Sequence, residues 1–217
     1  MNNRQAAVES RTPIQSPPPP GIVHPPTPKT GSEKMTTNPI ESIPGFKEGI
    51  AHAERIIVHE AGASTRELGF GFVASEHAPN TFAGLKNAWQ ISIDHREPLP
   101  VSPLNLDDCF FRPEVIHAQR FYHDAFHMVH NLSFDLRDEV ELGFIHMEAL
   151  AAHGISRDSM AYQILFADFV GQAIYMMHVR RFVSNQSLFI ADCVSQGMER
   201  AIFREANRSS DPGQQVA

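Results

Sequence analysis

The feature that most constrains the fold of this chain is a run of metal-binding residue types, His123-Asp124-Ala125-Phe126-His127, which Glu139 follows after eleven residues. Residues four apart lie on one face of an α-helix, so His123 and His127 point the same way. Glu139 can face them only if the chain reverses and returns as a second helix. The pattern therefore predicts a helical hairpin that closes around one site.

The residues between His127 and Glu139 are those that end one helix and start another. Asn131 suits a C-terminal cap, and Ser133 or Asp135 suits an N-cap. Glu139 then falls in the first turns of the returning helix, where the positive end of the helix dipole favours a carboxylate.

The candidate ligands carry the charge that a divalent ion needs. Two neutral imidazoles and two carboxylates sum to minus two, and mixed nitrogen and oxygen donors suit zinc, iron or manganese better than calcium. We expect one divalent metal ion, with zinc first and iron or manganese as alternatives. Its predicted ligands are His123, Asp124, His127 and Glu139.

Other roles stay open for several of these residues. Asp124 is either a ligand or a carboxylate that orients a ligand histidine. His130 shares the face of the histidine pair and competes as a ligand, although we rank it below Glu139. Three further residues lie in the same region and are ordinary helix residues by default: His117, His146 and Glu148.

The motif His-Asp-x-x-His, eleven residues, Glu resembles the coenzyme Q biosynthesis protein family, fourth member of the ubiquinone pathway set. The chain matches all four positions, and Arg120 stands where family members tend to carry an arginine. The resemblance is strongest over residues 111–150 and extends over about 46–205. The chain departs from the family pattern at Asn131 and Asp138, which replace glycines, and at His146, which replaces a glutamate.

The resemblance implies oxidative removal of the C1 carboxyl from a polyprenylated 4-hydroxybenzoate-derived ring, with a hydroxyl installed at that carbon. Arg120 would be a catalytic residue that holds a substrate carboxylate or hydroxyl, or would pair with a ligand acid. The expected partners are the quinone precursor, other quinone biosynthesis enzymes, a membrane surface and a second copy of the chain. The expected location is cytoplasmic and peripheral at the inner membrane, or the matrix side in a mitochondrion.

Two other classes of function remain. Zinc has no redox chemistry of its own, so a zinc protein of this kind fits a non-catalytic scaffold that presents lipid intermediates to partner enzymes. An unrelated metallohydrolase would recruit His117 and Asp168, and a di-iron oxidase would use Glu114-Val115-Ile116-His117. Net charge of −7 and the absence of RNP, zinc-finger and P-loop patterns argue against nucleic-acid binding.

Composition divides the chain into a tail and one domain. Residues 1–44 hold ten of the sixteen prolines in a Ser, Thr, Gln and Asn background that cannot form a core. We expect a disordered tail over 1–44, a helical domain over 45–210 and a disordered C-terminus over 211–217. The true start is Met1 or Met35. Two distant cysteines, Cys109 and Cys193, indicate neither disulfides nor a Cys-rich metal site.

Residues from 46 onward are helical in pattern, so the predicted fold is all-α, a single domain of six or seven helices. The expected helices cover residues 46–60, 64–76, 81–93, 113–130, 135–153, 156–181 and 185–208. Asp168 and two glutamines make 161–179 too polar for a membrane span, so it is a buried core helix or, with 188–202, the wall of a polyprenyl tunnel. Five arginines form a basic rim for lipid headgroups or a solvated face: Arg180, Arg181, Arg200, Arg204 and Arg208.

Overall fold

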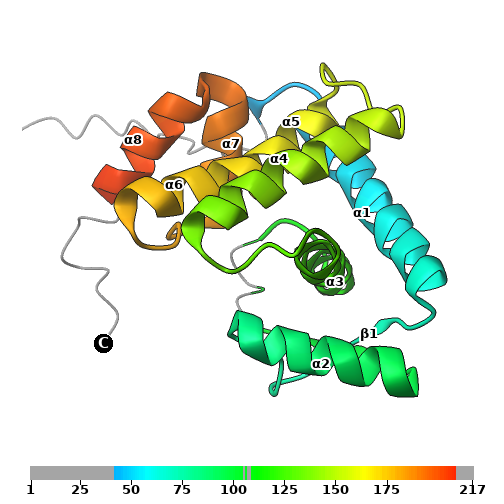
Figure 1. Cartoon of the computed structure of the whole chain (residues 1–217). Coiled ribbons are helices and arrows are strands. Elements are labelled where there is room, and N and C mark those ends of the chain that lie inside the picture. The colour runs from blue at the N-terminus through cyan, green and yellow to red at the C-terminus, as the bar shows by residue number, and fades with distance from the viewer. Residues whose placement is uncertain (1–41, 105, 107–108, 209–217) are drawn as a thin grey trace, which may run out of the picture. The chain divides into compact units, whose positions relative to one another are not determined.

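The computed structural model describes residues 42–104, 106 and 109–208, and over these the fold is all-α, as predicted (Figure 1). The predictions for residues 1–41 and 211–217 lie outside this part of the chain. The α-helices are α1 (Phe46–Leu68), α2 (Phe82–His95), α3 (Pro113–His130), α4 (Leu136–Ala152), α5 (Met160–Phe166), α6 (Gln172–Val179), α7 (Gln186–Gln196) and α8 (Met198–Arg208). A π-helical turn, η2 (Ala167–Gly171), joins α5 to α6, and two strands, β1 (Phe72–Ala74) and β2 (Leu99–Val101), pair in parallel.

The first part of the domain differs from the prediction of two helices over 46–60 and 64–76. It forms one helix, α1, which begins after Gly45 and ends at Gly69, and both glycines adopt positive φ. The amide of Gly69 caps the helix at the carbonyl of Thr65. Residues 72–74 form β1 instead of helix, and the strand was missed because three residues are too few to show an alternating pattern.

The hairpin of α3 and α4 forms nearly as predicted. Pro113 occupies the start of α3, and Asn131 ends it in the left-handed conformation at φ 51°, with its amide bonded to the carbonyls of His127 and Met128. In the turn, the Asp138 carboxylate accepts hydrogen bonds from the amide and the hydroxyl of Ser133, at 2.8 and 2.6 Å. The predicted C-cap is therefore confirmed, and Asp138 adds a tie that holds the turn.

The predicted helix over 185–208 was wrong in one respect, because Gly197 at φ 89° divides it into α7 and α8. The helix predicted over 156–181 runs through α5, η2 and α6, with one widened turn at Ala167–Gly171. Ile164, Leu165 and Val170 within it are fully buried, so this segment is a core helix. Among the described residues, no helix combines the length and apolar character needed to cross a membrane.

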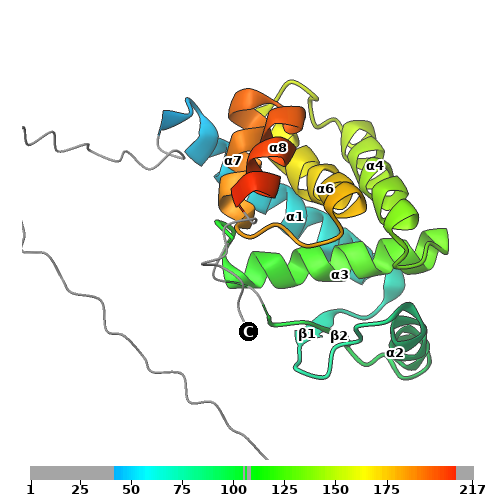
Figure 2. The same cartoon turned by 90° about the vertical axis from the view of Figure 1, so that its left-hand side faces the viewer.

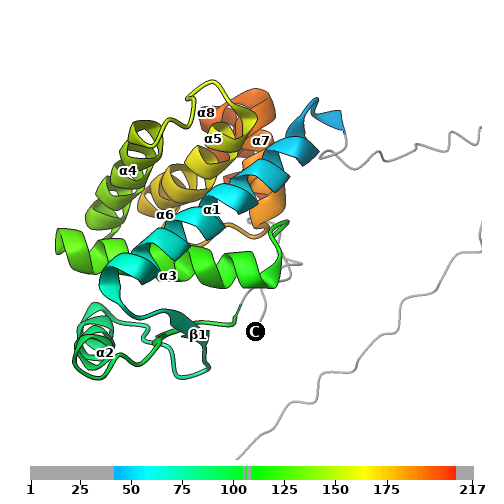
Figure 3. The same ribbon diagram turned by 90° about the vertical axis from the view of Figure 1, so that its right-hand side faces the viewer.

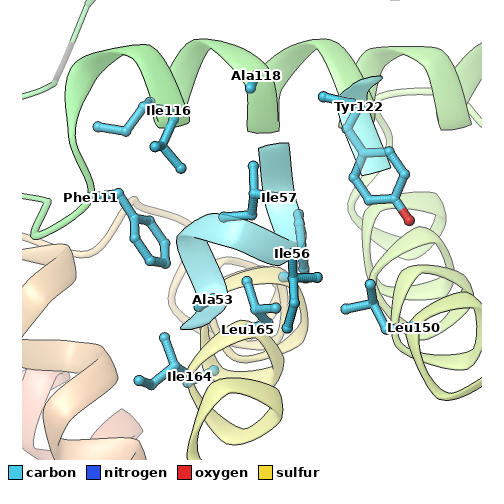
Figure 4. Packing of buried hydrophobic residues seen from close by; sticks show 14 of the residues in the cluster. Ala53, Ile56, Ile57, Phe111, Ile116, Ala118, Tyr122, Leu150, Ile164 and Leu165 are labelled. Atoms are coloured by element: carbon cyan, nitrogen blue, oxygen red, sulfur yellow. The ribbon is translucent and has the colours of Figure 1, made fainter. Parts of the chain in front are cut away.

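The helix α3 lies between two groups of elements (Figures 2 and 3). On one side it contacts α2 and the strands β1 and β2, and on the other it contacts α1 and α4. Apolar side chains of α1, α3, α4 and α5 meet in the core, among them Ile57, Ala118, Leu150 and Leu165 (Figure 4). The site helix is thus fixed from both sides.

The basic rim predicted from five arginines is largely used within the fold. Arg204 and Arg208 pair with Asp192 at 2.7 and 2.9 Å, and the guanidinium of Arg181 donates to the carbonyl of Ala206. These contacts tie α7 to α8 and the preceding loop to α8, so these three arginines serve as structural ties.

Gly143 on α4 sets the distance between α4 and η2. A methyl group at this position would lie 2.7 Å from the carbonyl oxygen of Phe169, which is backbone and cannot turn away. We predict that Gly143→Ala lowers the free energy of unfolding by about 1–3 kcal/mol, because α4 must shift. Chemical denaturation measures this change.

Gly62→Ala is the matched control. Gly62 lies in α1, where an added methyl meets only the flexible end of Arg66 at 3.4 Å. It should raise the free energy of unfolding by about 0.5–1 kcal/mol, as expected for glycine within a helix. Equal effects of the two substitutions would contradict the close approach at Gly143.

Candidate metal centre

Three of the predicted ligands meet at one point between α3 and α4. The Nε2 atoms of His123 and His127 lie 3.0 Å apart. Glu139 places Oε2 at 3.3 Å from Nε2 of His123 and Oε1 at 3.5 Å from Nε2 of His127. One donor atom from each residue lies within 4.8 Å of the other two. The prediction that Glu139 faces the histidine pair is confirmed.

The end of α3 also determines which nitrogen of His127 faces the site. Its Nδ1 lies 3.0 Å from the carbonyl oxygen of Leu132, in the turn that follows the helix. Since a carbonyl only accepts, Nδ1 carries the proton and donates it. Nε2 of His127 therefore faces Glu139 and His123; it can share a proton with Glu139 in the metal-free protein or offer its lone pair to a metal ion.

The three donors fit a small transition-metal ion. Two donors that bind one tetrahedral ion at about 2.0–2.1 Å are separated by roughly 3.3–3.4 Å. The separations of 3.0, 3.3 and 3.5 Å are close to this value. Three protein ligands leave at least one coordination position for a substrate or water, which is the arrangement of catalytic sites rather than closed structural ones.

Aromatic rings surround the donors. The ring of Phe134 lies 4.8 Å from that of His127, and Phe82 at the start of α2 packs against both. The ring of Phe169 stacks on His123 at 6.4 Å from the other side. His127 is fully buried, whereas His123 and Glu139 are about a quarter exposed, so the group opens to solvent on one side.

Asp124, the fourth predicted ligand, is not one of the three converging donors. Its carboxyl lies close enough to both histidines for their charges to lower its pKa. Burial raises the pKa of Asp124 to about 6, and the histidine charges offset only part of this effect. The structure therefore places a second carboxylate beside the centre, and its role as a ligand stays a prediction.

The guanidinium of Arg120, the predicted catalytic residue, donates to the carbonyls of Ser102 and Leu104, the latter at 2.6 Å. Burial lowers the pKa of Arg120, while the nearby Asp124 raises it. These contacts tie the connection before α3 to the site helix. Its contact with a substrate stays a prediction.

Sequence reasoning underrated His146. This residue is fully buried on α4, and its Nε2 lies 3.3 Å from Nδ1 of His123. The rings of Phe126, Phe169 and Tyr122 enclose it at 4.4, 4.5 and 4.6 Å. Burial holds its pKa well below the usual value, so its imidazole is neutral. Its position seven residues after Glu139, on the same face of α4, is the signal that identifies it.

The other candidates lie apart from the donors. His130 is exposed at the end of α3, where its ring packs on Phe126 at 5.3 Å, and Glu148 is exposed on α4. His117 keeps a buried Nε2 without a hydrogen-bond partner among the described residues. None of the three is among the donors that converge.

No protein-family model, curated protein or solved structure matches the chain.

The pair of His123 and Glu139 gives the metal-free protein a defined pH dependence. Burial acts to raise the pKa of Glu139, but its bonds to the two histidines outweigh burial and hold it at about 2. Burial acts to lower the pKa of His123, and Glu139 outweighs it, so the net shift is upward. Stability from Glu139 is complete above its unfolded pKa of about 4.3 and is lost as pH falls toward 2. Stability from His123 is complete below about 6.5 and is lost as pH rises through its raised value.

We therefore predict that chelator-treated protein has its largest melting-temperature advantage over Glu139→Gln between about pH 4.5 and 6.5, and that the advantage shrinks as pH rises through the raised pKa of His123. Thermal unfolding of both proteins across this range measures it. An advantage that stays constant from pH 5 into the alkaline range would show that the two groups are not coupled as described.

We also predict that His146→Leu weakens zinc binding by about 10–100-fold, because His123 loses the partner that orients its ring. His146→Gln, which keeps a hydrogen-bonding group in the same direction, should lose less. Competition with a chromophoric chelator measures the affinities, and circular dichroism verifies that each variant is folded. Wild-type affinity in His146→Leu would exclude an orienting role.

Proposed function

We propose that this protein is a metal-dependent enzyme of ubiquinone or related isoprenoid quinone biosynthesis, which replaces the C1 carboxyl of a polyprenylated 4-hydroxybenzoate-derived ring with a hydroxyl. The observation that carries the proposal is the convergence of His123, His127 and Glu139. Their spacing in the sequence is the motif of the coenzyme Q family that the chain resembles. The match at these positions supports the substrate class.

The donor set is suited to this chemistry. Removing the carboxyl as carbon dioxide and adding a hydroxyl is a two-electron oxidation of the ring. With dioxygen as the oxidant and water as the source of the hydroxyl oxygen, the dioxygen is reduced to hydrogen peroxide. Two histidines and one carboxylate with open positions form the ligand set of iron oxygenases, and a bound divalent ion would stabilise developing negative charge at the ring carboxyl. If the ion is zinc, the electron-rich ring itself supplies the electrons.

The residues beside the donors have roles in this reaction. Asp124 is largely buried beside the donors, where its carboxylate can accept a proton or orient a ligand histidine. Arg120 ties the 102–104 segment beside the site, so a substrate carboxylate that approached the centre would lie near a guanidinium. In the proposal, Arg120 holds the carboxylate of the substrate near the metal centre.

The remaining alternatives have less support. A di-iron oxidase needs a second group of carboxylates and histidines, but the described residues hold one group of three converging donors. Glu114, its candidate ligand, pairs with Arg112 at 3.1 Å. A metallohydrolase would use Asp168, whose carboxylate accepts hydrogen bonds from Gln119 and Gln172 instead. The scaffold role would be expected of a closed metal site rather than one with open positions.

The proposal includes the partners and the location that the family implies. They are a polyprenylated ring acid, other quinone biosynthesis enzymes, a second copy of the chain and the surface of the inner membrane. Exposed aromatic side chains such as Phe182 and Phe203, which are 83% and 71% exposed, support an apolar contact of this kind.

The test is complementation of a strain that lacks the protein. His127→Ala should fail to restore the quinone, and lipid extracts should accumulate a prenylated ring acid that still carries its C1 carboxylate. His130→Ala is the matched control, since it removes a histidine of the same helix that lies outside the donor group. It should restore the quinone. Normal quinone levels with His127→Ala would exclude the proposal.

A second measurement separates the enzyme from the scaffold. Purified metal-loaded protein should release carbon dioxide from the C1-labelled ring acid in the presence of dioxygen. If none is released, and partner enzymes associate with the wild type but not with His127→Ala, the scaffold role replaces the catalytic one.

A further inference from the structure

A second group of histidines surrounds a carboxylate of α1, that of Glu60. Glu60 is 5% exposed, and its Oε1 lies 3.2 Å from Nδ1 of His59. Nδ1 of His153, at the end of α4, lies 3.1 and 3.0 Å from the two oxygens of the same carboxylate. Residues from two helices thus bring imidazole nitrogens to one buried carboxylate.

This carboxylate borders a cavity of about 360 Å³. Its wall includes the three residues above together with His52, Arg55 and Ile155. His52 is seven residues before His59, so the two side chains lie on one face of α1. The cavity is therefore bordered by three imidazoles and one carboxylate, and it opens to solvent.

Among the described residues, Glu60 is the one carboxylate at this cavity, and its charge is balanced only when a neighbouring imidazole is protonated or a cation binds. Arg55 borders the same cavity, but no ion pair joins it to an acidic group within the described residues. On the inner side, the hydroxyl of Tyr122 is buried without a hydrogen-bond partner in that part of the chain. Burial, and then the negative charge of Glu60, raise the pKa of this hydroxyl. A cation beside Glu60 would compensate that charge.

We propose that Glu60, His153 and His59 form a second binding site for a transition-metal ion of the zinc class, with His52 available as a further ligand. Imidazole and carboxylate donors suit zinc, copper or nickel and are not those of magnesium or calcium. The nitrogen–oxygen distances of 3.0–3.2 Å are near the roughly 3.3 Å expected for two donors of one tetrahedral ion.

Binding at this site requires a side chain to turn. Within the described residues, only the first centre already brings three donors within 4.8 Å of one another. His59 and His153 are 70% and 54% exposed, so their rings are free to rotate toward a common ion while Glu60 stays fixed. The site is independent of the proposed function, because none of its residues belongs to the first centre.

The experiment is zinc loading of the full chain, followed by removal of loosely bound zinc on a desalting column and metal analysis. Wild-type protein should retain two zinc ions, and His153→Ala and His59→Ala should each retain one. Glu139→Ala should also retain one zinc ion. The double variant, Glu139→Ala with His153→Ala, should retain none. Both histidines of the second site are exposed enough for the variants to fold. His178→Ala, which removes an exposed histidine of α6, should retain two ions.

The two proposals fail separately. One retained ion in the wild type, lost in Glu139→Ala and unchanged in His153→Ala, would overturn the second site and leave the first intact. It would show that Glu60 and the two histidines form hydrogen bonds only. Two ions in His153→Ala would overturn the assignment as well, because the second ion would then lie elsewhere.

Discussion

The turn between α3 and α4 is the constraint on which the metal centre depends. A carboxylate twelve residues after a histidine meets it only if the second helix returns at the correct distance and rotation. Asn131 in the left-handed conformation ends α3, and the Asp138 carboxylate ties the turn to Ser133. The carbonyl of Leu132 in this turn also fixes the His127 ring. The same short segment therefore builds the hairpin and selects the nitrogen of His127 that faces Glu139.

Much of this region follows from sequence. The α3 boundaries, the cap at Asn131 and the meeting of His123, His127 and Glu139 were predictable, because local rules decide them: helical spacing, a capping residue and a short connection. The role of His146 was harder to see, since a histidine within a helix is usually an ordinary residue. Only the close approach of α4 to α3 shows that it contacts His123.

Other parts were decided by packing between distant segments, which sequence patterns do not reveal. The break predicted after residue 60 did not occur, because Ala61, Gly62 and Ala63 continue α1 and Gly69 ends it. The strands β1 and β2 are three residues each and exist only because they pair across 24 intervening residues, 75–98. The helix predicted over residues 185–208 is broken at Gly197, whose positive φ shows the break.

The surroundings of the donors indicate how the fold would tune a bound ion. The Nδ1 atom of His123 contacts a neutral imidazole, and the Nδ1 atom of His127 donates to a carbonyl. Neither neighbour adds negative charge to the ligand set. With Glu139 as the one carboxylate among the converging donors, a bound divalent ion would keep a net positive charge, and the protonation of the neighbouring Asp124 would decide how much of it remains.

The most direct measurement of the central claim is anomalous diffraction at the zinc edge from crystals of the zinc-loaded full chain. A peak is expected at about 2.0–2.2 Å from Nε2 of His123, from Nε2 of His127 and from an oxygen of Glu139. Zinc bound to the histidines with Glu139 turned away, or no zinc between α3 and α4, would contradict the assignment of the metal centre.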